Sequence, residues 1–317
     1  MTMFDRILVP LDRSPLAECV LPHAIALAHA LDAQVMLLHV LSLPDQQAGL
    51  RAVDALEWQL RRAEAESYLN GVCAQMKEAG VTCEIYVTDG DAAEQIVDFA
   101  RDNAVGLVLI ASHGQSGLSA WHVSSVAQKV IERTGGASLM LVRATHLPSA
   151  DIAAFRYHRV LAPLDGSTRA ECVLPVAAAL TRVPDTQILL AHVVERPAMP
   201  RRTPLSQEDN DLAERLVDRN YVEAEHYLEV VRSQLPPAAV DTRLLIGTHV
   251  ADSLHALVDQ EQIDLVLLSA HGYSGRVQWP YGGLVASFVA YGSCPLFIFQ
   301  DAPATQDAAA MRQEGRR

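Results

Sequence analysis

One stretch of this chain occurs twice and decides the fold. The first copy reads DRILVPLDRSPLAECVLP (residues 5–22), and the second reads HRVLAPLDGSTRAECVLP (residues 158–175), 153 positions later. In both copies a short apolar run ends in Pro-Leu-Asp, and the same six residues, AECVLP, close the stretch. Short apolar runs of this kind are typical of strands that are buried on both faces of a parallel sheet.

The repetition continues along the chain. QVMLLHV (34–40) matches QILLAHV (187–193), AESYL (65–69) matches AEHYL (224–228), and GLVLIASHG (106–114) matches DLVLLSAHG (264–272). The offsets are 153, 159 and 158, so they change only where a loop can gain or lose residues. Self-similarity of this kind indicates a duplicated unit. We predict two domains, about residues 1–145 and 155–301, joined by residues 144–154, and a disordered tail at 302–317.

Within each copy, strand and helix signals alternate in the order βαβαβαβαβ. Ser14 and Pro15 suit the N-cap and first position of a helix that runs to about Leu31. Pro22 and Pro175 either kink this helix and its counterpart or mark where the regular part begins. A long helix follows the second strand, with an apolar stripe at Ala65, Leu69, Val72, Met76 and Ala79, and Ala224, Leu228, Val231 and Leu235 repeat it. This alternation predicts an α/β fold with a parallel sheet covered by helices on both faces.

Composition narrows the class of protein. The chain has 317 residues, which suits two domains, and its net charge is −13 (25 Lys and Arg against 38 Asp and Glu). This charge disfavours nucleic acids and anionic membranes as main partners, because both reward basic patches. The first residues do not resemble a signal peptide, and no apolar run is long enough for a membrane span, so we expect a soluble cytoplasmic protein. The five cysteines form no Cys-x-x-Cys pair and are interpreted as small buried residues rather than metal or redox groups.

Candidate site residues follow the strands, because ligands of such sheets bind beyond the carboxyl ends of the strands. The loops after the fourth strands, 111–128 and 269–286, are rich in small residues and open a helix. Backbone N–H groups there would suit phosphate or another anion, and the hydroxyls of Ser112, Ser116, Ser124 and Ser125 would add donors. The alternative is a tight turn that merely lets the helix pack on the sheet.

At these residues the chain resembles the universal stress protein family, as a tandem member with two domains. The resemblance lies in PLDRS and PLDGS, the ECVLP helix, HV after the second strand, the ASHG and SAHG loops, and the closing strands SLMLVR and PLFIFQ. It implies two flavodoxin-like domains, each with five parallel strands ordered 3-2-1-4-5. It also implies ATP or a related adenine nucleotide as ligand, possible Mg²⁺ with it, and pairing of SLMLV with PLFIF as an internal pseudo-dimer.

The family's loop pattern, Gly-x₂-Gly-x₉-Gly followed by Ser or Thr, is only partly kept. The first copy has Ala111, Gly114, Ser124 and Ser125, and the second has Ser269, Gly272, Gly282 and Gly283. The first copy retains the hydroxyl and is therefore the better nucleotide candidate. By resemblance, the nucleotide-binding residues are Pro10, Asp12, Val40, Ala111, His113, Gly114, Ser124 and Ser125 in the first copy and Asp165, Val193, Ser269, Gly272, Gly282 and Gly283 in the second.

Several roles have a structural alternative. Asp12 and Asp165 either contact the nucleotide or cap the turn after the first strand. His113 and His271 either contact phosphate or hydrogen-bond the turn, and we favour the turn. The loops contain no Lys, with Arg276 their only basic residue, and no catalytic motif occurs elsewhere. We therefore expect a nucleotide-responsive stress regulator with an unidentified protein partner. The alternatives are a scaffold without nucleotide and a slow ATP hydrolase.

Overall fold

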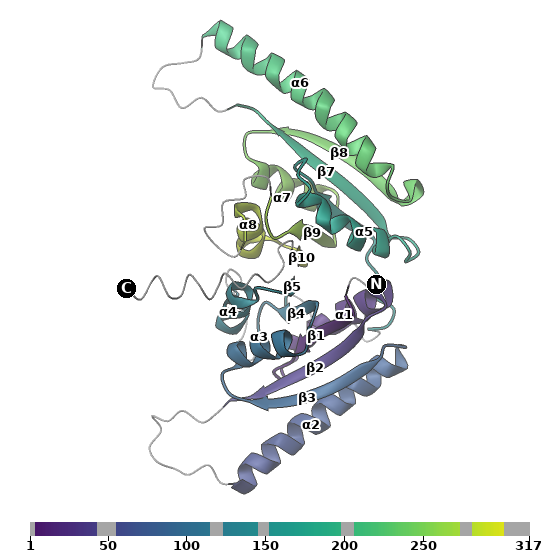
Figure 1. Cartoon of the computed structure of the whole chain (residues 1–317), viewed down its shortest axis with the longest axis vertical. Helices are drawn as coiled ribbons and strands as arrows, with labels where there is room; N and C mark the ends of the chain where they lie inside the picture. Colours follow the sequence, from purple (N-terminus) through teal and green to yellow (C-terminus); the bar gives the residue numbers. More distant parts are fainter. Residues whose placement is uncertain are drawn as a thin grey trace, which may run out of the picture.

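The structure, a computed structural model, describes residues 4–42, 55–114, 123–144, 152–197, 206–272 and 281–300. Two halves of the same build lie end to end (Figure 1). The first half contains β1 (Arg6–Pro10), α1 (Leu21–Leu31), β2 (Gln34–Leu41), α2 (Ala55–Glu78), β3 (Cys83–Asp89), α3 (Ala92–Asp102), β4 (Leu107–Ala111), α4 (Ser125–Arg133) and β5 (Ser138–Val142).

The second half repeats this order. It contains β6 (Arg159–Pro163), α5 (Leu174–Leu180), β7 (Gln187–Glu195), α6 (Gln207–Arg232), β8 (Val240–Gly247), α7 (Val250–Gln260), β9 (Leu265–Ser269), α8 (Gly283–Tyr291) and β10 (Leu296–Phe299). Short 3₁₀ turns, Ala17–Val20 and Ala170–Val173, precede α1 and α5, and a third, Pro237–Ala239, precedes β8. The predicted tail at 302–317 lies outside the described residues.

All ten strands belong to one sheet with the order β3-β2-β1-β4-β5-β10-β9-β6-β7-β8. Within each half the order is 3-2-1-4-5 and every pair is parallel, as predicted. The halves meet where β5 and β10 pair antiparallel, with Leu141 opposite Leu296 and Met140 opposite Phe297. This is the pairing of closing strands that the family resemblance implied.

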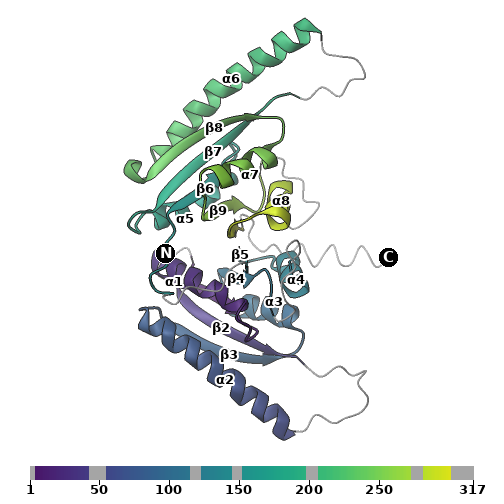
Figure 2. The same cartoon turned by 180° about the vertical axis from the view of Figure 1, so that it is seen from behind.

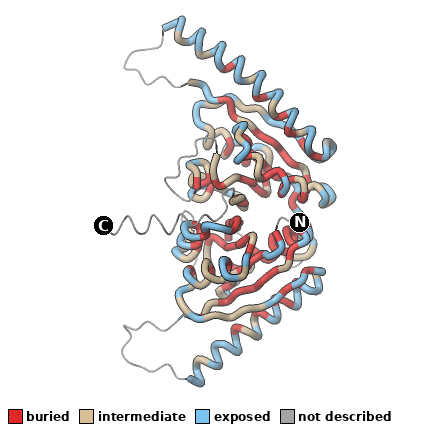
Figure 3. The backbone as a smooth tube through the Cα atoms, viewed as in Figure 1, coloured by how far each residue is buried: buried red, intermediate tan, exposed pale blue. Residues whose placement is uncertain are grey.

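Two apolar layers sandwich the sheet, and each continues from one half into the other. The buried cluster on one face includes residues of α1, α2, α5 and α6, and the cluster on the other face includes residues of α3, α4, α7 and α8. Views from opposite sides show α2 and α6 at the two far ends of the molecule (Figures 1 and 2). Burial is concentrated in the strands, while much of α2 and α6 is exposed (Figure 3). In the described parts of the chain, no helix has both the length and the apolarity needed to cross a bilayer.

The start of the first helix differs from the sequence expectation. Ser14 is not the N-cap of α1, because α1 begins at Leu21 with Pro22 in its first turn. Ser14 instead donates its backbone N–H (2.9 Å) and hydroxyl (2.6 Å) to Oδ1 of Asp12, and its own oxygens accept from the N–H of Ala17. Pro22 therefore marks the start of the regular helix, where the absence of an N–H costs no intrahelical bond.

Candidate functional site

A cavity of about 430 Å³ opens in the first half at the carboxyl ends of β1, β2 and β4. This volume lies within the range of small-molecule sites. The cavity is lined by all eight residues that the sequence nominated in this half: Pro10, Asp12, Val40, Ala111, His113, Gly114, Ser124 and Ser125. They come together because β1 lies between β2 and β4, which is the point where the strand order reverses.

Asp12 and Gly114 form the tightest contact of the site. Oδ1 of Asp12 accepts two hydrogen bonds from Ser14, so this carboxylate caps the turn after β1. Oδ2 points at Gly114, where an added Cβ would lie only 2.0 Å from it. Any side chain at position 114 would collide with this carboxylate, so a glycine is needed there. Asp12 lines the cavity even though it also caps the turn.

The loop after β4 leads into α4 with Ser124 as the N-cap. Oγ of Ser124 accepts from the N–H of Ala127 (3.2 Å), and its φ of −58° needs no glycine. Ala111 ends β4 in register with Val142 and is absent from the positive-φ residues, so both glycine replacements fit this backbone. The first N–H groups of a helix lack intrahelical partners, which leaves donors at Ser125 facing the cavity end.

Two polar residues of this loop, Ser112 and His113, make hydrogen bonds within the protein. The Ser112 hydroxyl, 1% exposed as a residue, accepts from the N–H of Ala144 and contacts Nδ1 of His113 (3.0 Å). The prediction that the Ser112 hydroxyl donates to a ligand is therefore wrong. His113 bonds the turn through Nδ1, as favoured, while its buried Nε2 has no hydrogen-bond partner in the described structure. Ser116 lies outside the described residues.

Val40 offers its backbone to the same cavity. The Leu38 carbonyl accepts from Leu11 on the β1 side, and the Leu41 carbonyl accepts from Gly90 on the β3 side. Because successive residues of a strand face opposite neighbours, the N–H and C=O of Val40 face the β1 side, beyond the point where β1 ends. The side chain of His39 bonds the Leu11 carbonyl (2.7 Å) and braces this edge.

The lining residues that the sequence did not reveal include two arginines and a tryptophan: Arg13, Arg61 and Trp58. Arg13 has a positive φ of 68° and pairs with Glu64 (3.2 Å), whereas Arg61 pairs with Glu57 (2.5 Å). Both pairs are exposed and hold their arginines weakly, so either guanidinium can turn to a phosphate at little cost. A comparison of the two copies could have drawn attention to these three residues. The repeat offsets place Gly166, Asn220 and Val217 at the matching positions of the second copy, so the two positive charges and the indole occur in the first copy alone.

The second half keeps the framework but not these cationic groups. Oδ1 of Asp165 caps the turn through Ser167 (2.9 and 2.6 Å), and a Cβ at Gly272 would lie 2.5 Å from Oδ2 of Asp165. Ser269 ends β9, Gly282 is the N-cap of α8, and Gly283 is its exposed first residue.

The cavity found in this half is different. It has about 480 Å³ and is lined by Gly166, Asn220, Tyr227 and the acidic Glu195 and Glu223. Of the six residues nominated in this half, it includes only Val193. Tyr281 stands where the first half has Val123, and the residue is buried. Arg276 lies outside the described residues.

The described residues give little support for a metal site or a reactive cysteine. In the described ranges, no three or more His, Cys, Asp or Glu side chains gather as a metal site. All five cysteines are free, and Cys19, Cys73 and Cys83 are buried. Burial raises the pKa of the Cys19 thiol to about 12, which keeps it protonated and unreactive at neutral pH.

Comparison with known proteins gives a consistent picture. The Universal stress protein family matches twice, at residues 3–142 and 156–300. The universal stress protein Sll1388 of Synechocystis is 30% identical over 140 residues, which are 40% of this chain and 91% of that protein. The universal stress protein MJ0577 of Methanocaldococcus jannaschii is 28% identical over 156 residues, 44% of this chain and 96% of that protein.

Among solved structures, one resemblance spans nearly the whole chain. A universal stress protein from Archaeoglobus fulgidus superposes with a TM-score of 0.62 at 16% identity, and the match covers 94% of this chain and 98% of that one. At this identity the likeness supports the tandem α/β fold and no further property.

Proposed function

The chain belongs to the universal stress protein family, and from this premise we propose that its first half binds ATP or a related adenine nucleotide. On this proposal the protein acts in the cytoplasm as a nucleotide-responsive regulator of the stress response, with another protein as its partner. The observation that carries the proposal is the cavity itself, because one space of about 430 Å³ brings together the substituted loop, Asp12 and two arginines.

The phosphate groups belong at the end of the cavity formed by the loop after β4. Backbone N–H groups at the start of α4, the hydroxyl of Ser125 and the missing side chain of Gly114 suit a close approach by phosphate oxygens. Arg13 and Arg61 supply the positive charge that the loop itself lacks. A guanidinium binds phosphate through two parallel hydrogen bonds, so these two residues offset the charge of a polyphosphate.

The base belongs beside β2 and Trp58 of α2, one helical turn from Arg61. Val40 presents its backbone N–H and C=O there, and Leu41, Trp58 and Ile96 supply apolar wall. Adenine has both a donor and an acceptor on one edge and a flat face that can stack on indole. Mg²⁺ would enter with the nucleotide, held largely by phosphate oxygens, and the Ser125 hydroxyl is the protein group best suited to join it.

The decisive experiment is isothermal titration of the full chain with Mg-ATP. The proposal expects one nucleotide per chain, although the chain has two domains, because Arg13, Arg61 and Trp58 have no counterparts in the second half. The paired substitution Arg13→Ala and Arg61→Ala should weaken binding about tenfold or more, since each removes a charge-assisted hydrogen bond.

Arg101→Ala is the matched control, because Arg101 is an exposed arginine that also pairs with acidic neighbours but does not line the cavity. No binding of Mg-ATP, ADP or AMP by the wild-type chain would leave the interaction scaffold as the remaining function. A stoichiometry of two would contradict the assignment to the first half.

A further inference from the structure

A cavity larger than that of the proposed nucleotide site lies away from it, between the two halves. It has about 810 Å³ and is lined by the second half of α1, by α5 and the turn after it, and by Arg156 and Tyr157 of the second half. The cavity of about 430 Å³ and this one share no lining residue. We name it the interhelix cavity.

The interhelix cavity is created by the duplication. The helices α1 and α5 are the repeated AECVLP helices, and equivalent positions face it from both halves, such as Ala26 with Ala179 and His29 with Arg182, each 153 residues apart. Neither half alone would enclose it. Its wall therefore combines side chains that differ between the copies, which gives it a chemistry of its own.

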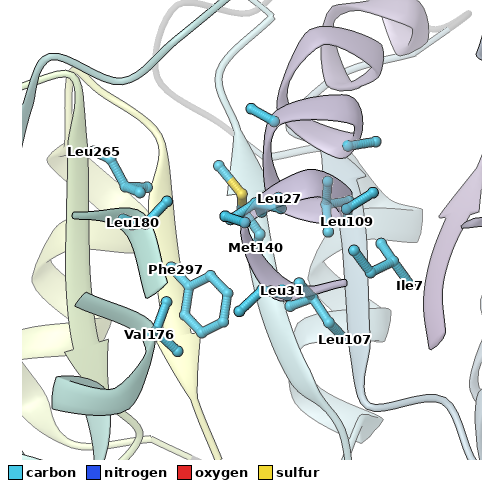
Figure 4. Close-up of a cluster of buried hydrophobic side chains, with 14 of the residues drawn as sticks. Ile7, Leu27, Leu31, Leu107, Leu109, Met140, Val176, Leu180, Leu265 and Phe297 are labelled. Carbon is cyan, nitrogen blue, oxygen red and sulfur yellow. The ribbon is translucent and has the colours of Figure 1, made fainter. Parts of the chain in front are cut away.

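Much of its wall is apolar and anchored in the core. Leu31 of α1 and Leu180 of α5 are 7% and 1% exposed and belong to one buried cluster with Phe297. Figure 4 shows Leu27 and Leu31 on one side and Val176 and Leu180 on the other, with Phe297 between them. A ligand seated here would cover alanine, leucine and proline carbons, so its body must be apolar.

The rim of the interhelix cavity carries a different charge from the rest of the chain. Two arginines, Arg156 and Arg182, and one acid, Asp32, line it, whereas the whole chain has a net charge of −13. The Arg182 guanidinium makes no hydrogen bond or ion pair within the described ranges, and Arg156 donates only to the carbonyls of Ala153 and Phe155. Neither arginine is neutralised by a carboxylate, so both can receive an anion.

The helix ends at this cavity offset only part of that charge. Both α1 and α5 end beside it, and unsatisfied carbonyls there would repel anions. At α5 the chain's own N–H groups bond those carbonyls, because Thr181, Arg182 and Val183 donate to Ala177, Ala179 and Leu180. At α1, by contrast, Asp32 and Ala33 both donate to the single carbonyl of Ala28. Arg156 and Arg182 are the two full positive charges that a ligand meets here, against one carboxylate, Asp32, and the partial negative charge at the end of α1.

We propose that the interhelix cavity is a second ligand site, which takes a small amphipathic anion with an aliphatic or aromatic body and one carboxylate, sulfonate or phosphate group. The body lies on the apolar wall between α1 and α5, and the anionic group lies at Arg156 and Arg182. This site shares no lining residue with the proposed nucleotide site, so either proposal can fail while the other holds.

The test uses the fluorescence of 8-anilinonaphthalene-1-sulfonate, an aromatic anion, titrated onto the folded full chain. We expect one site per chain, displacement of the probe by decanoate, and no displacement by decyltrimethylammonium at the same concentration, because the tails are alike and the charges opposite. Saturating Mg-ATP should leave the titration unchanged, since the two cavities share no wall.

Two kinds of variant locate the binding. The pair Arg156→Ala and Arg182→Ala should weaken probe and decanoate binding about tenfold, and Ala178→Phe should abolish binding by filling the space. Arg215→Ala on α6, an exposed arginine remote from the cavity, is the control for lost charge. Equal displacement by the ammonium compound, or unchanged affinity in the double arginine variant, would overturn the proposal.

Discussion

Gly114 and Asp12 lie so close together that the residue allowed at position 114 depends on the position of the Asp12 carboxylate. A side chain at position 114 would meet the carboxylate that caps the turn after β1, and the same relation recurs between Gly272 and Asp165. The recurrence explains why both copies keep this glycine while the other two glycines of the loop pattern vary. Ala111 and Ser124 tolerate their side chains because one ends a regular strand and the other is a helix N-cap.

The paired substitutions Gly114→Ala and Gly272→Ala separate this structural role from nucleotide binding. Each forces an aspartate to move and should cost about 1–3 kcal/mol of unfolding free energy. Only Gly114→Ala should also weaken Mg-ATP binding, by about tenfold or more, because only its cavity has the cationic groups. Urea denaturation and titration calorimetry measure the two effects. An equal loss of ATP affinity in both variants would contradict this distinction.

At the scale of elements, the pairing of β5 with β10 turns two sheets into one. Met140 and Phe297 are fully buried partners in this pairing, and the Phe297 ring also meets Phe4 of the first half edge-on at 6.0 Å. Arg143, which follows β5, donates to the carbonyls of Phe288 and Val289 in α8 (2.8 and 2.6 Å). Strands that would otherwise be exposed, apolar edges are covered by one another.

Phe297→Ala should therefore destabilise both halves together. The lost ring leaves a cavity in a core that the halves share, and such losses cost about 3–5 kcal/mol. Phe299→Ala on the same strand is the control, and since Phe299 is only partly buried, the loss should be smaller. Thermal unfolding followed by circular dichroism measures both. Equal effects of the two substitutions would show that the shared core does not hold the junction.

At the scale of the whole molecule, the junction contains a buried histidine. Nδ1 of His23 in α1 lies 2.7 Å from the hydroxyl of Tyr157, which belongs to the second half. Phe155 packs edge-on against the His23 ring at 4.6 Å, and the side chain is almost entirely out of water. Burial lowers the pKa of His23 from 6.5 to about 4, because the charged imidazolium loses its hydration.

This pKa shift predicts that acid weakens the junction. Above pH 6.5 the histidine is neutral in both folded and unfolded chains, whereas between pH 6.5 and 4 only the unfolded chain binds the proton. Unfolding free energy should therefore fall by about 3 kcal/mol over that range and level off below it. Urea denaturation at a series of pH values tests this, with His23→Gln as the reference variant. A wild-type profile parallel to that of the variant would refute it.

The sequence predicted those residues of the site whose position follows from their neighbours along the chain, and it did not predict those brought in by packing between distant segments. Asp12, Val40 and Gly114 could be named because each lies at or just beyond a strand end, which local apolar runs reveal, and within a motif that resembles the family's. Arg13 stands next to Asp12 but was not recognised, since its role depends on the direction of its side chain. Arg61 and Trp58 lie on α2, and only the packing of α2 beside the end of β2 brings them to the cavity. The prediction of one regular helix starting at Ser14 was wrong because Ser14 bonds Asp12 and the N–H of Ala17, the first residue of a 3₁₀ turn, and the α-helix begins only at Leu21.

The amino-acid sequence alone determined the duplication, the alternation of strands and helices, and the residues at the strand ends, because periodicity and repeated motifs are properties of neighbours along the chain. The family resemblance implied that β5 and β10 pair, and the tertiary structure confirmed it. The tertiary structure alone decided that arginines line the cavity at the strand ends of the first half but not the one found in the second half, and that α1 and α5 enclose a further cavity between the halves. These features arise between segments far apart in sequence, where side-chain direction and packing, rather than local pattern, set which groups meet.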